Sequence, residues 1–244
     1  NRDENLAKVE SLIDSALKTP RDLVALPEMF SLRNPLTSKD LGEDENGPSL
    51  SLVKKLAKKY SVNIAAGSIW ESIEGSKYLY NASAMINRFG EVVDVYRKVH
   101  LFDAIVGSRS IKESSRFMSG NEPVLTEVDH IKAGLSICYD LRFPELYRAM
   151  GLCDLMVVPA AFTYTTGQAH WEILLRARAI ENLAYVVAPA QGGMHSNGRT
   201  TWGHSMVIDP WGEILACHVQ GPGVAIAEID LGRIAKVRAN LPAL

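Results

Sequence analysis

The chain has 244 residues, 47% of them hydrophobic and 22% charged, so it can bury a full core. Its formal charge of −2 and its pI near 6.3 give no electrostatic reason to expect nucleic acid or an anionic membrane as a partner. The longest apolar runs, such as 155–162, are far shorter than the roughly 20 residues of a membrane span, and the polar start at residues 1–4 is unlike a secretory signal or a transit peptide. No linker divides the sequence, which predicts a single domain over residues 1–244.

The first predicted element is an amphipathic helix. Asn1 and Glu4 predict a capping box before apolar residues at helical spacing, namely Leu6, Val9, Leu12, Ile13, Ala16 and Leu17. Helices are predicted at 4–18, 49–60, 144–151, 168–183 and 231–239.

Strands are predicted between these helices from β-branched and aromatic runs that turn residues interrupt. They cover 23–27, 62–69, 79–87, 91–97, 132–138, 154–159, 185–190, 204–209, 213–219 and 223–229. The alternation with helices favours α/β layering, while the hairpin-like pairs at 79–97 and 204–229 favour local antiparallel pairing. Mixed sheets flanked by helices are therefore expected.

The three cysteines are Cys138, Cys153 and Cys217. They are too few and too widely spaced for a disulfide framework, and none forms a Cys-x-x-Cys pair. A reducing compartment fits this usage, so we expect a cytoplasmic protein.

Three of the predicted strands end at a reactive side chain. Strand 23–27 leads to Glu28, strand 91–97 leads to Lys98, and strand 132–138 ends at Cys138. Parallel strands share one edge for such ends, and open α/β sheets build their sites there. Taken singly, Glu28 fits a loop cap, Lys98 a solvated charge and Cys138 a small buried hydrophobe. Taken together, the three predict one site.

Cys138 lies at a corner between the end of an apolar strand and a helix that Pro144 begins. Free backbone N–H groups and a favourable dipole at such a corner stabilise both a thiolate and an oxyanion. The corner therefore suits a nucleophile.

Three motifs occur in the same order along the chain: Pro27 to Phe30 (PEMF), Tyr96 to Phe102 (YRKVHLF) and Cys138 to Glu145 (CYDLRFPE). They resemble the Glu, Lys and Cys signatures of the nitrilase superfamily of carbon–nitrogen hydrolases. Downstream, 167–181 and 203–212 resemble the branch that includes deaminated glutathione amidase and ω-amidase.

The resemblance implies a fold as well as a reaction. The fold expected for this family is a four-layer α-β-β-α sandwich of mixed β-sheets. The family usually begins with a strand, whereas this chain begins with the predicted helix, so the resemblance implies that the N-terminal strand is missing and that its pairing partner is exposed.

The implied reaction is hydrolysis of a terminal carboxamide to a carboxylate and ammonia, with no cofactor. Such chemistry needs a nucleophile, a proton acceptor that later becomes a donor, and groups that face the oxyanion. By resemblance, Glu28 takes the thiol proton of Cys138, which forms a thioester with the substrate, and Glu28 then activates water. Lys98 and the N–H of Tyr139 are expected to hold the oxyanion.

Glu113 aligns with an extra glutamate that this family uses to orient the lysine and the substrate. The preceding segment 104–110 lacks the proline-glycine pair expected there. A solvated Glu113 is the alternative.

The branch resemblance implies a deaminated-peptide amide or a short dicarboxylic monoamide as substrate. Deaminated glutathione is the first expectation, with α-ketoglutaramate or succinamate as the alternative. The distal carboxylate of such a substrate needs a cationic or N–H-rich pocket. The loop 194–201, with His195 and Arg199, is the candidate.

Other readings of the sequence remain open. A papain-like Cys–His pair would join Cys138 to one of the six histidines, and the Glu and Lys motifs argue against it. The histidines are His100, His130, His170, His195, His204 and His218. A nitrile hydrolase or an acyl transferase would share the motifs. A catalytically silent binding or scaffold protein with the same fold is the alternative from another class.

Two further expectations concern metals and assembly. His170 and Glu172 lack the second histidine of an H-E-x-x-H site, so no metal site is expected. Arg142 is expected to tie down the cysteine corner. Helix 168–183 has a salt-paired face, and the family resemblance points to a homodimer that packs through helices of this kind.

Overall fold

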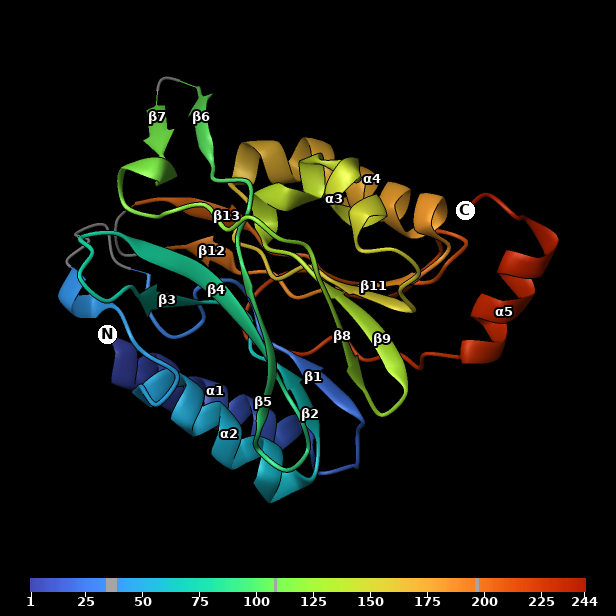
Figure 1. Ribbon diagram of the computed structural model, residues 1–244, viewed down its shortest axis with the longest axis horizontal. Helices are drawn as coiled ribbons and strands as arrows, with labels where there is room; N and C mark the ends of the chain where they lie inside the picture. The colour runs from blue at the N-terminus through green and yellow to red at the C-terminus, as the bar shows by residue number, and fades with distance from the viewer. Residues whose placement is uncertain (34–38, 108, 196–197) are drawn as a thin grey trace. The chain divides into compact units, whose positions relative to one another are not determined.

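Helices and strands alternate along most of the chain in a computed structural model, which describes residues 1–33, 39–107, 109–195 and 198–244 (Figure 1). The chain divides into two compact units, Asn1–Glu122 (unit 1) and Pro123–Leu244 (unit 2). Each unit contains a mixed sheet and its own helices. The prediction of a single domain over residues 1–244 stays a prediction.

Unit 1 is built on the strands β1 (Leu23–Ala25), β2 (Asn63–Ala65), β3 (Ile69–Ser72), β4 (Leu79–Ile86) and β5 (Val92–Arg97). β1 and β2 are parallel. β4 is the long strand: it pairs antiparallel with β2 and β3 along one edge and with β5 along the other. The β4–β5 hairpin turns at Gly90, which has a φ of 81° that glycine adopts without strain.

Two helices, α1 (Arg2–Ala16) and α2 (Pro48–Tyr60), belong to unit 1. The capping box predicted at the start of α1 is confirmed. The Asn1 Oδ1 accepts a hydrogen bond from the Glu4 N–H at 2.9 Å, and the Asn1 amide donates to the Glu4 carboxylate at 3.0 Å. Pro48 begins α2, where a missing N–H costs nothing.

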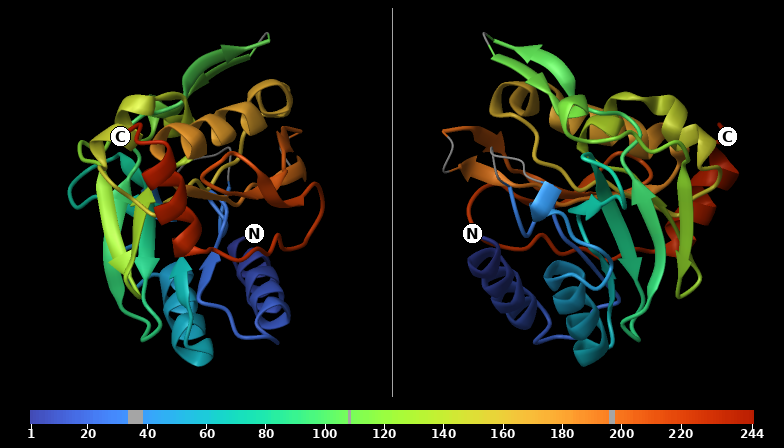
Figure 2. Two further views of the ribbon diagram at one scale, coloured as in Figure 1. Left: turned by 90° about the vertical axis from the view of Figure 1, so that its right-hand side faces the viewer. Right: turned by 60° about the vertical axis from the view of Figure 1, so that its left-hand side comes forward.

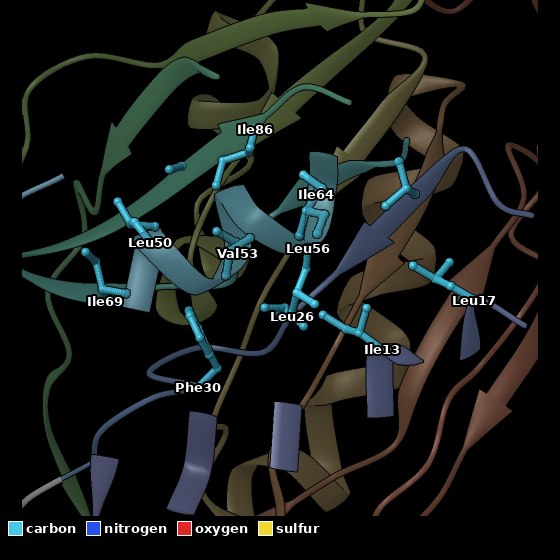
Figure 3. Packing of buried hydrophobic residues seen from close by; sticks show 14 residues of the cluster. Ile13, Leu17, Leu26, Phe30, Leu50, Val53, Leu56, Ile64, Ile69 and Ile86 are labelled. Carbon is cyan, nitrogen blue, oxygen red and sulfur yellow. The ribbon is translucent and has the colours of Figure 1, made fainter. Parts of the chain in front are cut away.

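The apolar faces of these helices meet the sheet of unit 1 in one buried cluster (Figure 3). Each large aliphatic side chain buried in this way contributes about 1.5–3 kcal/mol. The helices and the C-cap of α1 supply Ile13, Leu17, Leu50, Val53 and Leu56, and the strands and their ends supply Leu26, Ile64, Ile69 and Ile86.

A hairpin of β6 (Asp103–Val106) and β7 (Arg109–Lys112) projects from the rest of unit 1 (Figures 1 and 2). Ile105 on this hairpin is 79% exposed. A single 3-10 turn, Glu113–Ser115, follows it. The hairpin was not predicted, although it occupies the segment that lacks the expected proline-glycine pair.

Unit 2 has a six-stranded sheet in the order β15-β14-β11-β10-β9-β8. The central strands β9, β10 and β11 are parallel, and the outer strands are antiparallel to their neighbours. The strands are β8 (Val124–Val128), β9 (Ile131–Leu135), β10 (Leu155–Val157), β11 (Tyr185–Ala188), β14 (Ser205–Ile208) and β15 (Ile214–His218).

The helices of unit 2 are α3 (Pro144–Ala149), α4 (Tyr164–Asn182) and α5 (Leu231–Asn240). α4 packs on the sheet through Trp171 and Leu175, which are fully buried. The Trp171 indole N–H donates to the carbonyl of His204 at 2.9 Å, which ties α4 to β14. A small hairpin of β12 (Gly192–Met194) and β13 (Thr200–Trp202) lies beside α4.

The structure confirms all five predicted helices, with ends shifted by a few residues, and nine of the ten predicted strands. The run predicted as strand 62–69 is divided between β2 and β3. The strand predicted at 223–229 is wrong: residues 224–230 alternate in exposure but belong to no described ladder. Within the described ranges, none of the helices has the length and apolar composition of a membrane span.

Candidate active site

Glu28 follows the short strand β1 in a tightly bent segment of unit 1. The N–H of Leu26 still donates to Ala65 in strand fashion, and the chain then leaves the sheet. Met29 has a φ of 53°, a left-handed conformation that a non-glycine residue adopts at a cost. Its N–H donates to the Ser68 hydroxyl at 2.9 Å. The bend turns the chain directly after Glu28, whose side chain is buried.

Gly67 permits the close approach of chain segments at this bend. Its φ is 56°, and a Cβ at this position would lie 2.2 Å from the carbonyl oxygen of Pro27. A side chain at position 67 would therefore displace the backbone that carries Glu28.

Lys98 follows the last residue of β5, and its backbone is held on both sides. Its N–H donates to the carbonyl of Asn81 at 2.9 Å, and its own carbonyl accepts from the Gly120 N–H at 2.9 Å. The residue is 1% exposed. The predicted alternative of a solvated lysine is therefore wrong.

The ammonium group of Lys98 lies between two carboxylates. Its Nζ is 3.1 Å from Oε1 of Glu28, and 3.2 Å and 3.0 Å from Oε1 and Oε2 of Glu113. The Glu113 side chain is 9% exposed, so it is not the solvated residue that was the alternative. The N–H of Phe102 also donates to Oε2 of Glu113, at 2.6 Å.

Asn81 completes this group from the middle of β4. Its amide Nδ2 donates to Oε1 of Glu28 at 3.0 Å and to Oε1 of Glu113 at 3.2 Å. We call Glu28, Asn81, Lys98 and Glu113 the carboxylate cluster. The sequence analysis missed Asn81. The signal that could have found it is an asparagine inside a strongly apolar strand, where this residue type is depleted.

The carboxylate cluster carries two carboxylates and one ammonium in a buried place. Removing such charges from water costs several kcal/mol per ion unless charge pairing and hydrogen bonds compensate. The printed contacts supply both, because every charged group in the cluster has charge-assisted partners. Such an arrangement can hold a carboxylate and an ammonium in fixed positions for proton transfer and oxyanion stabilisation.

Cys138 lies in unit 2 at the corner that the sequence predicts. β9 ends at Leu135, the 3-10 helix Cys138–Arg142 follows, and Pro144 begins α3. Cys138 has a φ of 52°, and its N–H donates to the carbonyl of Pro159 at 2.9 Å. A left-handed non-glycine residue costs about 1–3 kcal/mol and is typical of functional sites. The residue is 9% exposed.

Buried hydrogen bonds of the residues on either side of Cys138 stabilise this corner. The Asp140 carboxylate accepts from the N–H of Ile137 at 2.9 Å, which closes the turn. The Tyr147 hydroxyl donates to Ser136 at 2.9 Å, and the Ser136 hydroxyl donates to Val157 at 3.0 Å. Burial raises the pKa of Tyr147 far above its ordinary value. The phenol therefore stays a neutral donor at any physiological pH.

A second residue that the sequence analysis missed is buried against the corner. The Arg178 guanidinium, on α4, donates from Nε and Nη2 to the carbonyl of Leu141, at 3.0 Å and 2.8 Å. Arg142, the residue expected to tie down the corner, lies 3.3 Å from Nδ1 of His170 on α4, and its guanidinium lies 5.9 Å from the centre of the Tyr139 ring. The helical spacing of α4 does not reveal that Arg178 is buried while Arg176, on the same helix, is not.

Tyr139 lies in the 3-10 turn directly after Cys138, with its ring 5.3 Å from that of Phe143. His195 and Arg199 lie in the β12–β13 hairpin, where the His195 N–H donates to the Arg199 carbonyl at 2.8 Å. The His195 ring contacts the Thr201 hydroxyl at 2.7 Å. Residues 196 and 197 of the predicted substrate loop lie outside the described residues.

The structure thus brings Glu28, Lys98 and Glu113 together in unit 1, and places Cys138 and Tyr139 side by side in unit 2. The catalytic and binding roles given to these residues stay predictions. In the described part of the chain, no three histidine, cysteine or carboxylate side chains gather as metal ligands would.

The chain is similar to known carbon–nitrogen hydrolases over its whole length. It is 43% identical to a deaminated glutathione amidase of Synechocystis over 251 aligned positions, which cover 100% of this chain and 92% of that protein. It is 39% identical to a deaminated glutathione amidase of Dictyostelium discoideum, over 99% of this chain and 88% of that protein.

Solved structures show the same fold. The NitFhit protein of C. elegans matches 99% of this chain and 60% of its own chain, with a TM-score of 0.92 and 35% identity. Nit3 of Saccharomyces cerevisiae, a member of the nitrilase superfamily, matches 99% of this chain and 89% of its own, with a TM-score of 0.88 and 30% identity. The predicted α/β fold class of the nitrilase kind is confirmed. The family model described as carbon–nitrogen hydrolase matches residues 1–239, and the chain therefore belongs to the carbon–nitrogen hydrolase family.

Proposed function

We propose that this protein is a thiol-dependent amidase that hydrolyses deaminated glutathione. The observation that carries the amidase reaction is the buried carboxylate cluster. It holds the Glu28 carboxylate and the Lys98 ammonium in contact, and both residues are shielded from solvent. The substrate is proposed from the relatives named deaminated glutathione amidase, which cover nearly the whole chain at about 40% identity.

In the proposed reaction, Glu28 accepts the thiol proton of Cys138 and the sulfur attacks the amide carbonyl carbon. Lys98 and the N–H of Tyr139 stabilise the oxyanion of the tetrahedral intermediate. The C–N bond then breaks, the leaving amine takes the proton from Glu28, and a thioester remains on Cys138. Glu113 keeps Lys98 in place through the contacts at 3.0 Å and 3.2 Å.

The second half of the reaction releases the acid. Glu28 takes a proton from water, and the resulting hydroxide adds to the thioester carbonyl. The C–S bond breaks, Glu28 returns its proton to the departing sulfur so that the thiol of Cys138 is restored, and the acid leaves and loses its proton to water as a carboxylate. General acid–base assistance of this kind contributes about 10²–10⁴-fold in rate, and one oxyanion donor about 10²–10³-fold.

The identity of the leaving group distinguishes the candidate substrates. In deaminated glutathione the amide nitrogen belongs to a cysteinyl residue, so its hydrolysis releases cysteinylglycine. A terminal carboxamide such as α-ketoglutaramate or succinamate releases ammonia instead. The sequence-based expectation of ammonia therefore applies to the alternative substrates and not to the first one.

Steady-state rates on deaminated glutathione, α-ketoglutaramate and succinamate test the proposal. We expect the highest kcat/KM on deaminated glutathione, with stoichiometric release of cysteinylglycine. A higher kcat/KM on either terminal carboxamide would reject the proposed substrate. An acyl mass on the peptide that contains Cys138 after an acid quench supports the thioester, whereas the same mass on Cys153 or Cys217 would reject it.

The pocket for the distal carboxylate of the substrate is proposed at the β12–β13 hairpin. Arg199 supplies a cation and His195 a ring that already contacts the Thr201 hydroxyl. Arg199→Met should raise KM for deaminated glutathione at least tenfold and leave the KM for a neutral amide unchanged. Equal changes for both amides would remove Arg199 from the pocket.

The protein is also proposed to be a homodimer that packs through α4. Ile173 on this helix is 69% exposed and Ile180 is 44% exposed. Gly212 packs closely against Ile180, since a Cβ atom on Gly212 would lie 2.6 Å from the Ile180 side chain. The neighbouring Trp211 is exposed and extends the same apolar surface. Large exposed apolar side chains that adjoin one another are typical of protein interfaces. Light scattering should give twice the chain mass for the wild type and the chain mass for Ile173→Glu.

The three cysteines are free thiols. Their use as thiols fits a reducing compartment, and a cytoplasmic location is part of this proposal. Fractionation of cells that make the protein tests it.

A further inference from the structure

Asn81 holds an unusual position for an amide side chain. It lies within β4, it is fully buried, and its neighbours along the strand are mostly apolar. Its Nδ2 donates to one oxygen of Glu28 and one oxygen of Glu113, at 3.0 Å and 3.2 Å. The Nζ of Lys98 contacts the same two oxygens, at 3.1 Å and 3.2 Å. The four side chains therefore form a closed ring in which two donors alternate with two acceptors.

The contacts fix which way the amide of Asn81 faces. If the amide were turned over, its carbonyl Oδ1 would face two carboxylate oxygens, and the contacts would become repulsive. In the observed orientation, Oδ1 is buried and has no hydrogen-bond partner in the described part of the chain. A buried unsatisfied carbonyl is costly, and this one persists because the Nδ2 donors face two carboxylates.

The backbone of Asn81 has a separate role in the same group. Its carbonyl accepts the N–H of Lys98 at 2.9 Å, directly after β5 ends. One residue thus contacts the backbone of the lysine and the side chains of both glutamates. These partners come from three separate parts of unit 1: the loop after β1, the end of β5 and the turn after β7.

The charge of the ring explains why an amide is suited to this position. The ring contains two carboxylates, Glu28 and Glu113, and one ammonium, Lys98, which pairs with both. Its formal charge is therefore −1. A second cation would neutralise the base. An amide instead supplies two N–H groups that stabilise both carboxylates and leaves their charge unchanged.

We propose that Asn81 is a positioning residue of the amidase reaction, which holds the Glu28 carboxylate charged and correctly placed beside Lys98. This inference rests on the proposed function, because it assigns Glu28 the role of base. Asn81 itself touches neither the substrate nor the thiol in this scheme. It acts through the two glutamates and the lysine.

Two variants of Asn81 separate positioning from simple packing. Asn81→Asp keeps the shape, removes the two donors and adds a third carboxyl group, whereas Asn81→Ala removes the donors and leaves a small cavity. Ser83→Ala is the matched control, because Ser83 lies on the same face of β4, is buried, and its hydroxyl has no partner in the described part of the chain. It removes a buried polar group without touching the ring.

The measurements are kcat, KM, the pH profile of kcat/KM, and the midpoint of thermal unfolding. Loss of the donors destabilises the carboxylate form of Glu28 relative to the acid form, so the acidic limb of the profile should move to higher pH, by about one unit for Asn81→Ala and further for Asn81→Asp. We expect kcat to fall at least about tenfold, which is the scale of one hydrogen bond to a charged group, while KM changes less than threefold. Ser83→Ala should keep the wild-type profile.

The outcomes distinguish this inference from the proposed function. If the wild type hydrolyses none of the three amides, the proposed function is rejected whatever Asn81 does. If the wild type is active and both Asn81 variants keep its acidic limb, Asn81 is a packing residue and the inference is overturned. A third buried carboxyl group could prevent Asn81→Asp from folding, in which case the acidic limb of Asn81→Ala decides alone. Full activity in Asn81→Asp with loss only in Asn81→Ala would also overturn it.

Discussion

Iodoacetamide should distinguish Cys138 from the other two thiols by rate. Cys153 is almost fully buried, and burial raises its pKa from 9.0 to about 11. Since only the thiolate reacts, two pH units make the reactive form of Cys153 about a hundredfold scarcer at neutral pH, before any steric hindrance is counted. Desolvation by neighbouring atoms also raises the pKa of Cys217, although this residue is exposed. Cys138 is expected to react first, because its proposed base removes the thiol proton.

The assay is a time course of labelling at neutral pH with mass mapping of the peptides. We expect Cys138 to be labelled at least about a hundredfold faster than Cys153, and Glu28→Gln to slow Cys138 without changing Cys153. The comparison also tests whether groups in unit 1 act on a thiol in unit 2. Labelling of Cys138 no faster than Cys153 would refute the reasoning, and so would a rate for Cys138 that is unaffected by Glu28→Gln.

Four further results are expected. Above pH 9.0 the unfolded chain loses the Cys153 proton while the folded chain keeps it up to about pH 11, so the free energy of unfolding should fall by about 1.4 kcal/mol per pH unit in this window, and Cys153→Ala should remove that part of the slope in chemical denaturation. Glu28→Gln should abolish turnover with an unchanged circular dichroism spectrum, because the amide is nearly isosteric but accepts no proton; wild-type-like turnover would exclude Glu28 as the base. Cys138→Ser should bind substrate in calorimetry yet turn it over orders of magnitude more slowly, since a hydroxyl ionises far less readily than a thiol, and substrate turnover near the wild-type rate would contradict this. Gly67→Ala should lower both the thermal midpoint and kcat, because the added Cβ lies 2.2 Å from a backbone oxygen next to Glu28, whereas Gly75→Ala meets nothing within 4 Å and should lower neither by as much.

Much of the fold follows from local sequence signals. The capping box at Asn1 and Glu4, the turn at Gly90 and the proline that begins α3 are each specified by a few adjacent residues, and each is present in the structure. The three strand ends at Glu28, Lys98 and Cys138 were also readable, because apolar runs stop there. Local signals therefore placed Glu28 and Lys98 directly after the correct strands, whereas the strand predicted to end at Cys138 ends at Leu135 and Cys138 begins a 3-10 helix.

The remaining features depend on partners that lie far away along the chain. The run 223–229 has the alternation of a strand, and the observed exposure of 224–230 alternates too, but a strand also requires hydrogen bonds to a neighbour, which no local pattern encodes. Strand β8 (Val124–Val128) was missed for the opposite reason: Thr126 and Glu127 interrupt its apolar pattern, and its ladder with β9 makes it a strand. Tertiary pairing decides both segments.

The candidate site shows the same division. Glu28, Lys98, Glu113 and Cys138 carry reactive groups, so their residue types attract notice in a sequence. Asn81 and Arg178 do not, because an amide in a strand and an arginine in a salt-paired helix have many ordinary roles. Their importance lies in contacts to residues 53 and 37 positions away, which only the folded chain brings together.

The ring of four side chains has a consequence for the order in which the chain folds. Its hydrogen bonds join residues that are 70, 53, 32 and 15 positions apart, so each bond closes a long loop and repays the entropy of closure only after the intervening strands are in place. The β4–β5 hairpin can form early from neighbouring residues, whereas the ring must wait for four distant segments. We therefore expect the ring, on which the proposed reaction depends, to form late as unit 1 folds and to open early as unit 1 begins to unfold.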